Sequence, residues 1–343
     1  MRGEDRGARA FWVRPPGRGE IRPAPLPPVG PEEARVRTLR SAVSRGTEAL
    51  VLDGHVPAGQ YDLMRAPFQE GELPGPVKYG YLNVGTVEEG PAPLRGRAVF
   101  CLYPHQTAYV VPAAALVPVP DEVPVTRAVL AGTVETAVNA VWDLGPLPGD
   151  RIAVVGAGMV GCCVARLLVQ VPGVEVTLVD VDPARAATAS ALGVAFARPD
   201  DLGRPGGGPA GAGGHDAVVH TSATSAGLRL SLELLAPDGE VLELSWYGDR
   251  PVEVALGGAF HSGRLAVRAS QVGAVARSRR DRRTRHQRLS LAMGLLRDPA
   301  YDCLLTGQSR FDELPAVLPR LASGELRGLC HSITYEEDEA CSA

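Results

Sequence analysis

A glycine-rich turn between an apolar strand and an apolar helix limits the folds open to this chain more than any other segment does. Residues 151–155 (RIAVV) read as a buried strand, GAGMVG follows at 156–161, and residues 159–171 have the apolar character of a buried helix. Gly156 permits a tight turn, Gly158 lets the backbone approach a pyrophosphate, and Gly161 allows the helix to pack closely on the strand. N–H groups at the helix start would then face the phosphates. The segment predicts a dinucleotide-binding unit.

An acidic residue at the end of the next strand supports this prediction. The strand spans 174–182, and Asp180 comes 24 residues after Gly156 (180 − 156). A carboxylate there accepts both ribose hydroxyls of NAD and repels the extra phosphate of NADP, so we expect NAD as the cofactor. Arg185 could contact the ribose or a phosphate, or be an ordinary arginine on a helix surface. The alternative for the whole motif is a nucleotide-binding fold that has lost its cofactor.

The pattern of elements divides the chain in two. The first ~120 residues read as short strands separated by turns rich in Pro and Gly, for example 33–44, 81–90, 97–103 and 108–113. From residue 125 on, helices at 127–145 and 183–193 alternate with strands that continue at 216–223, 239–248 and 265–273. Such alternation predicts an α/β protein with a parallel, doubly wound sheet. Residues 311–328 are expected to form a helix, which a final strand follows.

Composition excludes several classes of protein. The 343 residues are 45% hydrophobic with a net charge of −4, which fits a two-domain globular protein and not a broad nucleic-acid surface. No apolar run has the length of a membrane span, and the first residues lack the apolar core of a signal peptide, so a cytoplasmic location is expected. The cysteines form no CxxC pair, and Cys162 and Cys163 are expected to be core residues; all six are Cys101, Cys162, Cys163, Cys303, Cys330 and Cys341.

Two segments interrupt the alternation. Residues 201–216 are rich in glycine and are expected to form a surface loop. Residues 276–288 (ARSRRDRRTRHQR) are strongly basic and run into a helix. The second segment is either a solvated arginine face or a phosphate-binding surface, and we favour the first interpretation.

Over nearly its full length the chain resembles the medium-chain dehydrogenase/reductase superfamily. SRGTE at 44–48 is similar to the family's CGTD segment, GYLNVG at 80–85 to its GHExxG segment, TAYVVP at 107–112 to its AEYVVVP strand, and FDELPAV at 311–317 to the segment before the last helix. The resemblance implies a GroES-like β-rich catalytic domain at 1–133 and 273–343 and a Rossmann domain at 134–272. It also implies a homodimer, for which the apolar strands at 239–247 and 265–272 are candidate edges.

The family's zinc ligands are missing from the matching positions. The resemblance places Arg45, Tyr81 and Gly132 at the three catalytic ligand positions, and Leu82 at the glutamate of GHExxG. None of these is a normal zinc ligand, and the segment between Phe100 and Tyr109 is too short for the family's structural zinc lobe. We therefore expect no metal site. The GTE and GY patterns are similar to the bacteriochlorophyllide dehydrogenase-like branch, which oxidises a secondary alcohol.

The resemblance also implies roles for residues of the emptied metal site. Thr47 matches a proton-relaying hydroxyl, Tyr81 could act as acid or base, and Arg45 could lower the pKa of that tyrosine. Glu48 matches a residue that orients the metal ligands, and Thr136 matches a threonine in contact with the nicotinamide. Tyr81 could instead only fill space, and Arg45 could simply pair with Glu48.

Residues outside the matched motifs give weaker signals. His105 and Lys78 are expected on the surface, and His261 faces either the cleft or the surface.

The sequence thus predicts a zinc-independent, NAD-dependent oxidoreductase that interconverts a secondary alcohol and a ketone. Its partner is a small-molecule substrate, with no nucleic acid or membrane. A quinone or enone reductase and a non-catalytic nucleotide-binding protein remain alternatives.

Overall fold

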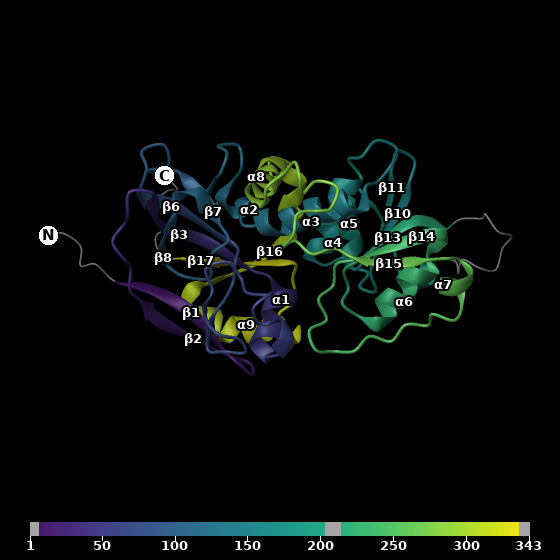
Figure 1. The fold of residues 1–343 in the computed structure, drawn as a ribbon, viewed down its shortest axis with the longest axis horizontal. Helices are drawn as coiled ribbons and strands as arrows, with labels where there is room; N and C mark the ends of the chain where they lie inside the picture. Colours follow the sequence, from purple (N-terminus) through teal and green to yellow (C-terminus); the bar gives the residue numbers. More distant parts are fainter. Residues whose placement is uncertain (1–6, 203–213, 336–343) are drawn as a thin grey trace. The chain divides into compact units, whose positions relative to one another are not determined.

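A computed structural model describes residues 7–202 and 214–335 of the chain (Figure 1). Residues 203–213, which make up most of the glycine-rich segment 201–216, lie outside the described residues, as does Cys341. Two compact units are present, one made of residues 1–132 and 305–343 and the other of residues 133–304. The first boundary lies one residue from the expected one, whereas the chain returns to the first unit at Leu305 instead of at residue 273.

The first unit is built mainly from antiparallel strands. One sheet has the order β2-β1-β5-β4, and the other has the order β16-β17-β3-β6-β7-β9 with β8 paired to β3. Their bounds are β1 Ala8–Arg14, β2 Arg18–Ala24, β3 Glu33–Val43, β4 Glu70–Gly71, β5 Val77–Lys78, β6 Asn83–Glu89, β7 Ala98–Cys101, β8 Ala108–Pro112, β9 Val117–Pro118, β16 Leu305–Arg310 and β17 Cys330–Thr334. Alternating burial along β3 places one of its faces in the core, as the period of a half-buried strand requires.

Helices of the first unit follow its strands. They are α1 (Arg45–Asp53), α2 (Val125–Ala128) and α9 (Leu314–Ser323). Helix α1 was not predicted from the sequence; it is followed by Gly54 in a left-handed conformation and packs against α9. Because α1 begins directly after β3, it holds residues 44–48 beside the end of that strand.

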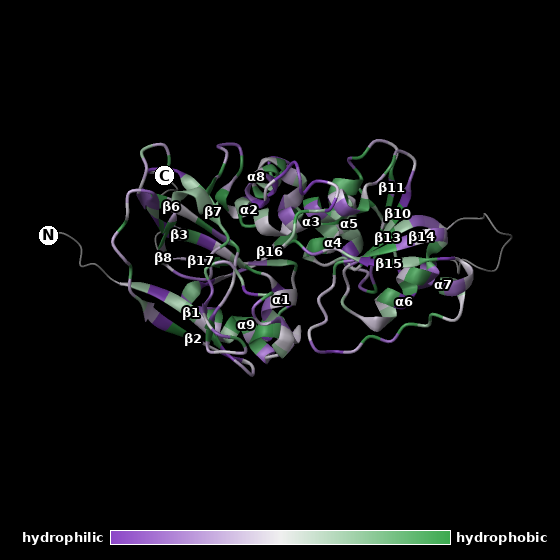
Figure 2. Cartoon of the chain, viewed as in Figure 1, coloured by the Kyte–Doolittle hydropathy of each residue, from purple (hydrophilic) through white to green (hydrophobic). Residues whose placement is uncertain are grey.

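The second unit is a parallel sheet covered by helices, as the sequence predicted. Its strand order is β12-β11-β10-β13-β14-β15, a doubly wound arrangement that reverses between β10 and β13. The strands are β10 Arg151–Val155, β11 Glu175–Val179, β12 Ala195–Ala197, β13 His215–His220, β14 Leu235–Glu243 and β15 Ala266–Ala269. The helices are α3 Ala131–Leu144, α4 Met159–Leu168, α5 Arg185–Ala191, α6 Ser225–Glu233, α7 Ala259–Ser262 and α8 Arg285–Leu295. Figure 2 shows hydrophobic residues on α4 and α6, and both Cys162 and Cys163 are buried in α4, as expected.

One buried arginine explains why residues 273–304 belong to the second unit. Arg288 of α8 is 1% exposed and forms an ion pair of 3.0 Å with Glu135 of α3. Its guanidinium also donates to the Asn139 side chain and to the carbonyls of Val272 and Ala274. The other arginines of the basic segment are exposed: Arg277, Arg279, Arg280, Arg282, Arg283 and Arg285. The expected solvated face therefore holds for these arginines and not for Arg288.

The sheet also corrects the expected dimer edge. Strand β14 is hydrogen-bonded to β13 on one side and to β15 on the other, so the segment 239–247 is interior. Strand β15 ends the strand order and remains the candidate edge. None of the helices in the described ranges is long and apolar enough to cross a membrane.

Candidate functional site

The glycine-rich turn of the second unit has the geometry that the sequence predicted. Gly156 has a φ of +110°, which side chains rarely adopt, and it directly follows β10. A Cβ on Gly161 would lie 1.9 Å from the carbonyl oxygen of Gly156, so the helix packs against the turn too closely for any side chain. A Cβ on Gly158 would meet no atom within 4 Å. The backbone is thus open where a pyrophosphate would approach the start of α4.

Asp180 lies beside this turn. One carboxylate oxygen accepts a hydrogen bond from the Ala157 N–H at 2.7 Å, and the other accepts from the Asp182 N–H at 2.9 Å. Each oxygen keeps a second acceptor position, so the fixed carboxylate can still accept ribose hydroxyls.

The structure places the other two predicted cofactor residues on helices α5 and α3. Arg185 begins α5 and lies 3.6 Å from the Asp182 carboxylate, which indicates a role within its own loop. Thr136 is half-buried on α3.

Three hydroxyl groups gather in the first unit around Tyr81, one of the positions where the resemblance places a metal ligand. The Tyr81 hydroxyl donates to Ser44 Oγ at 2.5 Å, and the Thr47 hydroxyl also interacts with the phenol. We call Ser44, Thr47 and Tyr81 the hydroxyl cluster. Burial raises the pKa of the Tyr81 phenol, and the charge of Glu48 adds to that rise. Hydrogen bonds with Ser44 and Thr47 act in the opposite direction and are outweighed.

Glu48 connects the hydroxyl cluster to a buried chain of polar groups. Its Oε1 accepts from the Ser44 N–H at 2.7 Å, and its Oε2 lies 3.0 Å from His105 Nε2. On the other side of the ring, His105 Nδ1 lies 2.7 Å from Ser41 Oγ, which lies 2.9 Å from the Tyr335 hydroxyl. The sequence did not indicate Ser41, Ser44 or Tyr335 as site residues, and Tyr335 lies 294 residues from Ser41 in the chain.

Arg45 does not join the hydroxyl cluster as we expected. Its side chain is exposed, and within residues 7–202 and 214–335 it forms no ion pair with Glu48, whose partner is His105. Arg45 is not among the groups that act on the pKa of Tyr81, which are burial, Ser44, Thr47 and Glu48. Arg45 is the first residue of α1, where its side chain is exposed while that of Glu48 is buried.

The expected positions of two other residues also need correction. His105 and Lys78 are each 1% exposed, not on the surface. The Lys78 ammonium donates to Gln106 Oε1 at 2.8 Å and forms an ion pair with Glu70. Burial lowers the pKa of Lys78, although Glu70 opposes the shift. His261, in α7, is exposed.

The residues at the metal positions do not fit zinc. Position 132 is a glycine whose added Cβ would lie 2.5 Å from Leu82 Cδ2, so a leucine side chain fills the space beside it. Leu82 is 2% exposed and presents no ligand atom. In the part of the chain that the structure describes, no group of three or more His, Cys, Asp or Glu side chains could hold a metal ion.

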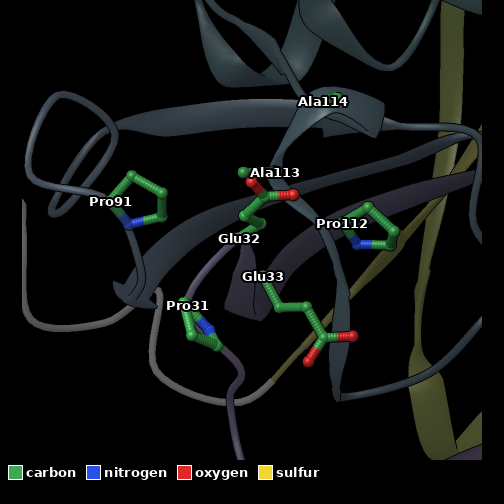
Figure 3. Close-up of a pocket in the computed structure, with 7 residues that line it drawn as sticks. All are labelled: Pro31, Glu32, Glu33, Pro91, Pro112, Ala113 and Ala114. Atoms are coloured by element: carbon green, nitrogen blue, oxygen red, sulfur yellow. The ribbon is translucent and has the colours of Figure 1, made fainter.

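A surface hollow lies at the far end of β3 from the hydroxyl cluster. It has a volume of about 460 Å³, and Figure 3 shows Glu32, Glu33 and three prolines around it. Strand β3 begins at Glu33 and ends at Val43, so roughly 30 Å separates the hollow from Ser44. The Glu33 carboxylate already accepts from the Gly30 N–H at 2.9 Å. The hollow is not part of the candidate site.

Several solved structures that share this fold are dehydrogenases. The chain is similar to the 2R,3R-butanediol dehydrogenase of Bacillus subtilis, with a TM-score of 0.74, 16% identity, and 96% and 99% of the two chains covered. An alcohol dehydrogenase of Thermus sp. ATN1 matches with a TM-score of 0.71, 19% identity, and coverage of 96% and 100%. An alcohol dehydrogenase of E. coli CFT073, complexed with NADH, matches with a TM-score of 0.73, 15% identity, and coverage of 95% and 99%. No family model matches the sequence. These likenesses confirm the expected fold.

Proposed function

We propose that this chain is a zinc-independent, NAD-preferring oxidoreductase that interconverts a secondary alcohol and a ketone. The observation that carries the proposal is the Tyr81 phenol, which replaces a metal ligand and is held 2.5 Å from Ser44. A positioned phenol can give or take the proton that accompanies hydride transfer. The alcohol dehydrogenases that share the fold support the reaction class.

Each unit of the chain has a separate task in the proposed reaction. In the second unit, the N–H groups at the start of α4 bind the pyrophosphate and Asp180 accepts the ribose hydroxyls. The bound cofactor supplies hydride to a ketone or accepts it from an alcohol. In the first unit, Tyr81 turns its O–H from Ser44 to the ketone oxygen and gives up the proton as the C–H bond forms. Ser44 and Thr47 then relay a proton from solvent to the phenolate. Glu48 is anchored by Ser44 and His105 and orients this cluster.

No step requires a metal, since the residues at the metal positions do not fit one. A neutral phenol O–H can stabilise the developing alkoxide by a hydrogen bond and then protonate it. Asp180 favours NAD over NADP because a fixed carboxylate repels a 2′-phosphate. We further propose that two copies of the chain associate through the free edge of β15.

A binding and turnover experiment tests this function. Thermal shifts of the purified protein with NAD, NADH, NADP and NADPH establish the cofactor, and absorbance of the reduced cofactor then monitors panels of secondary alcohols and ketones. We expect stabilisation by NAD(H), and turnover that survives a chelator. Turnover only with quinones or enones would replace the proposed reaction, and cofactor binding without any turnover would indicate a non-catalytic protein.

A further inference from the structure

A second polar chain lies at the carboxyl ends of β13 and β14. His220 ends β13 and is 0% exposed. Its Nε2 lies 2.7 Å from Ser222 Oγ, and its Nδ1 lies 2.7 Å from Glu243 Oε2 at the end of β14. We call these three residues the Ser222 relay. Only Ser222 of the three follows its strand into the turn, and it is partly exposed.

Glu243 is fixed from several sides. The Ser245 N–H donates to its Oε1 at 2.7 Å, and the Tyr247 hydroxyl donates to its Oε2 at 2.9 Å. Burial alone would raise the pKa of Glu243, but the hydrogen bonds from His220 and Ser245 outweigh it and the pKa is lowered. An ionised carboxylate accepts hydrogen bonds and donates none. Glu243 therefore places the hydrogen of the imidazole on Nδ1.

This arrangement decides which hydrogen bonds the Ser222 hydroxyl donates and which it accepts. When the imidazole is neutral and carries its hydrogen on Nδ1, Nε2 can only accept. Ser222 then donates its O–H to His220, and the lone pairs of Ser222 Oγ are left to accept. Thr224 Oγ1, at 3.0 Å, is one hydroxyl within reach, and a ligand hydroxyl could be another.

Two glycines keep space for Ser222 beside the cofactor turn. A Cβ on Gly227 of α6 would lie 2.1 Å from Ser222 Oγ and 2.7 Å from His220 Nε2. A Cβ on Gly156 would lie 2.8 Å from the backbone nitrogen of Ser222. Ser222 is thus a direct neighbour of the glycine-rich turn.

The strand order indicates which part of a dinucleotide Ser222 would meet. A dinucleotide lies across the carboxyl ends of the strands at the point where the strand order reverses. Asp180 follows β11 on one side of the turn, and Ser222 follows β13 on the other side. If Asp180 accepts the adenosine ribose and the turn binds the pyrophosphate, the second ribose reaches β13.

We propose that Ser222 Oγ accepts a hydrogen bond from a hydroxyl of the nicotinamide-side ribose, and that His220 and Glu243 are positioning residues that hold Ser222 as an acceptor. The inference rests on the proposed dinucleotide function. It assigns the nicotinamide-side ribose to a serine whose hydroxyl is kept as an acceptor by the buried residues His220 and Glu243.

The variant Ser222→Ala tests the proposal through its affinities for three ligands, NADH, ADP-ribose and ADP, which contain different parts of the cofactor. NADH and ADP-ribose carry the second ribose, whereas ADP ends at the pyrophosphate. We expect the variant to bind NADH and ADP-ribose about threefold to tenfold more weakly, the range for one net hydrogen bond, and to bind ADP unchanged. Ser278→Ala, which removes an exposed hydroxyl elsewhere in the unit, is the matched control and should bind all three ligands normally.

Substitutions of His220 test the positioning role. Asn places its amide near the Nδ1 position and loses the contact with Ser222, whereas Gln places its amide near the Nε2 position and can keep it. We expect His220→Gln to bind NADH more tightly than His220→Asn, and neither change to weaken NADH binding further in the Ser222→Ala background. Additive losses in the double variants would show a purely structural role and overturn the positioning part.

The outcomes for the two proposals are distinguishable. If the unaltered protein binds NADH and Ser222→Ala binds it equally well, the inference is wrong and the proposed function stands. Equal weakening for ADP and NADH also overturns the inference, because the effect then lies in the adenosine half. If the unaltered protein binds no nicotinamide dinucleotide, both proposals fail. Ser222→Ala decides the matter alone if the His220 variants do not fold.

Discussion

Replacement of Tyr81 by phenylalanine removes the proposed proton-transferring group and little else. The ring of Tyr81 meets the ring of Tyr79 edge to face, with centroids 6.3 Å apart and an interplanar angle of 81°. Phenylalanine keeps this contact and loses only the hydroxyl that donates to Ser44 Oγ at 2.5 Å. The hydroxyl contacts both Ser44 and Thr47, which are half-buried and can find water, so we expect a stability loss of about 1–2 kcal/mol, the net contribution of one or two hydrogen bonds.

The expected effect on catalysis is much larger than the effect on stability. Removal of a group that transfers a proton or stabilises charge in the transition state lowers turnover by about 10²–10³-fold, or roughly 2.7–4 kcal/mol of barrier. NADH binding should be unchanged, since Asp180 and the glycine-rich turn belong to the other unit. Stopped-flow absorbance of the reduced cofactor, with the true substrate, measures the rate of turnover and its dependence on NADH concentration.

The pH profile gives a second measure because burial raises the pKa of Tyr81 above its ordinary value of 10.0. Ketone reduction needs the protonated phenol, which is the predominant form at every pH below that raised value. The step that depends on Tyr81 should therefore be independent of pH from about 6 to 9. Alcohol oxidation needs the phenolate, whose fraction rises tenfold per pH unit below the pKa, so its rate should still be rising at pH 10.

Tyr79→Phe is the matched control, because it removes the hydroxyl of a neighbouring buried tyrosine that has no part in the proposed step. We expect it to retain turnover and both pH profiles. Near-full turnover of Tyr81→Phe, or a plateau of the oxidation rate below pH 9 in the unaltered protein, would refute the reasoning. Tyr81 would then only fill the space of the missing metal.

Four further predictions address the cofactor, the metal, the turn and the assembly. Asp180→Ser should erode a preference for NAD over NADP that we expect to be about tenfold or more in isothermal titration; equal binding of both cofactors by the unaltered protein would contradict this. Elemental analysis should find less than ~0.2 zinc atoms per chain, because the ligand positions hold no zinc ligand. One zinc atom per chain would show that this prediction is wrong. Gly161→Ala should lower the free energy of unfolding by about 1–3 kcal/mol. Gly158→Ala, whose Cβ meets open space, should leave the melting temperature unchanged and weaken only NADH binding. Equal stability of the two variants would count against the packing argument. Light scattering at micromolar concentration should give a dimer that Val267→Lys on the exposed β15 edge weakens, and a monomeric mass of the unaltered protein would exclude the proposed edge.

Local patterns allowed the parallel half of the fold to be predicted. The alternation of β10, α4, β11 and α5 follows from apolar runs and a glycine turn, and these signals depend on neighbours in the sequence. Helix α1 was not predicted because it is only 9 residues long and its buried side is defined by α9, far along the chain. The interior position of β14 depends on both of its neighbours in the sheet, which the apolar pattern alone does not show.

The candidate site shows the same division between local and distant information. Asp180 and the glycines were predicted because their spacing within one βαβ unit is characteristic. The partner of His105 lies 57 residues away, and the partner of Arg288 lies 153 residues away. Within ARSRRDRRTRHQR all arginines look alike, so nothing in the sequence distinguished the one that is buried. Distant pairing of this kind decides which polar groups form a site.

The charges near Tyr81 bear on the direction in which the proposed reaction runs faster. A zinc ion would favour an alkoxide and ease removal of the hydroxyl proton. In this chain the ionisable group that acts on the phenol is Glu48, whose negative charge disfavours the phenolate, and the one nearby cation expected from sequence, Arg45, is exposed. Tyr81 therefore keeps its proton at neutral pH and is better prepared to give a proton than to take one. We infer that near neutral pH the chain reduces a ketone with NADH faster than it oxidises the alcohol with NAD. A comparison of the two rates at saturating substrate and pH 7 tests this, and faster oxidation would show that a base other than the Tyr81 phenolate removes the proton.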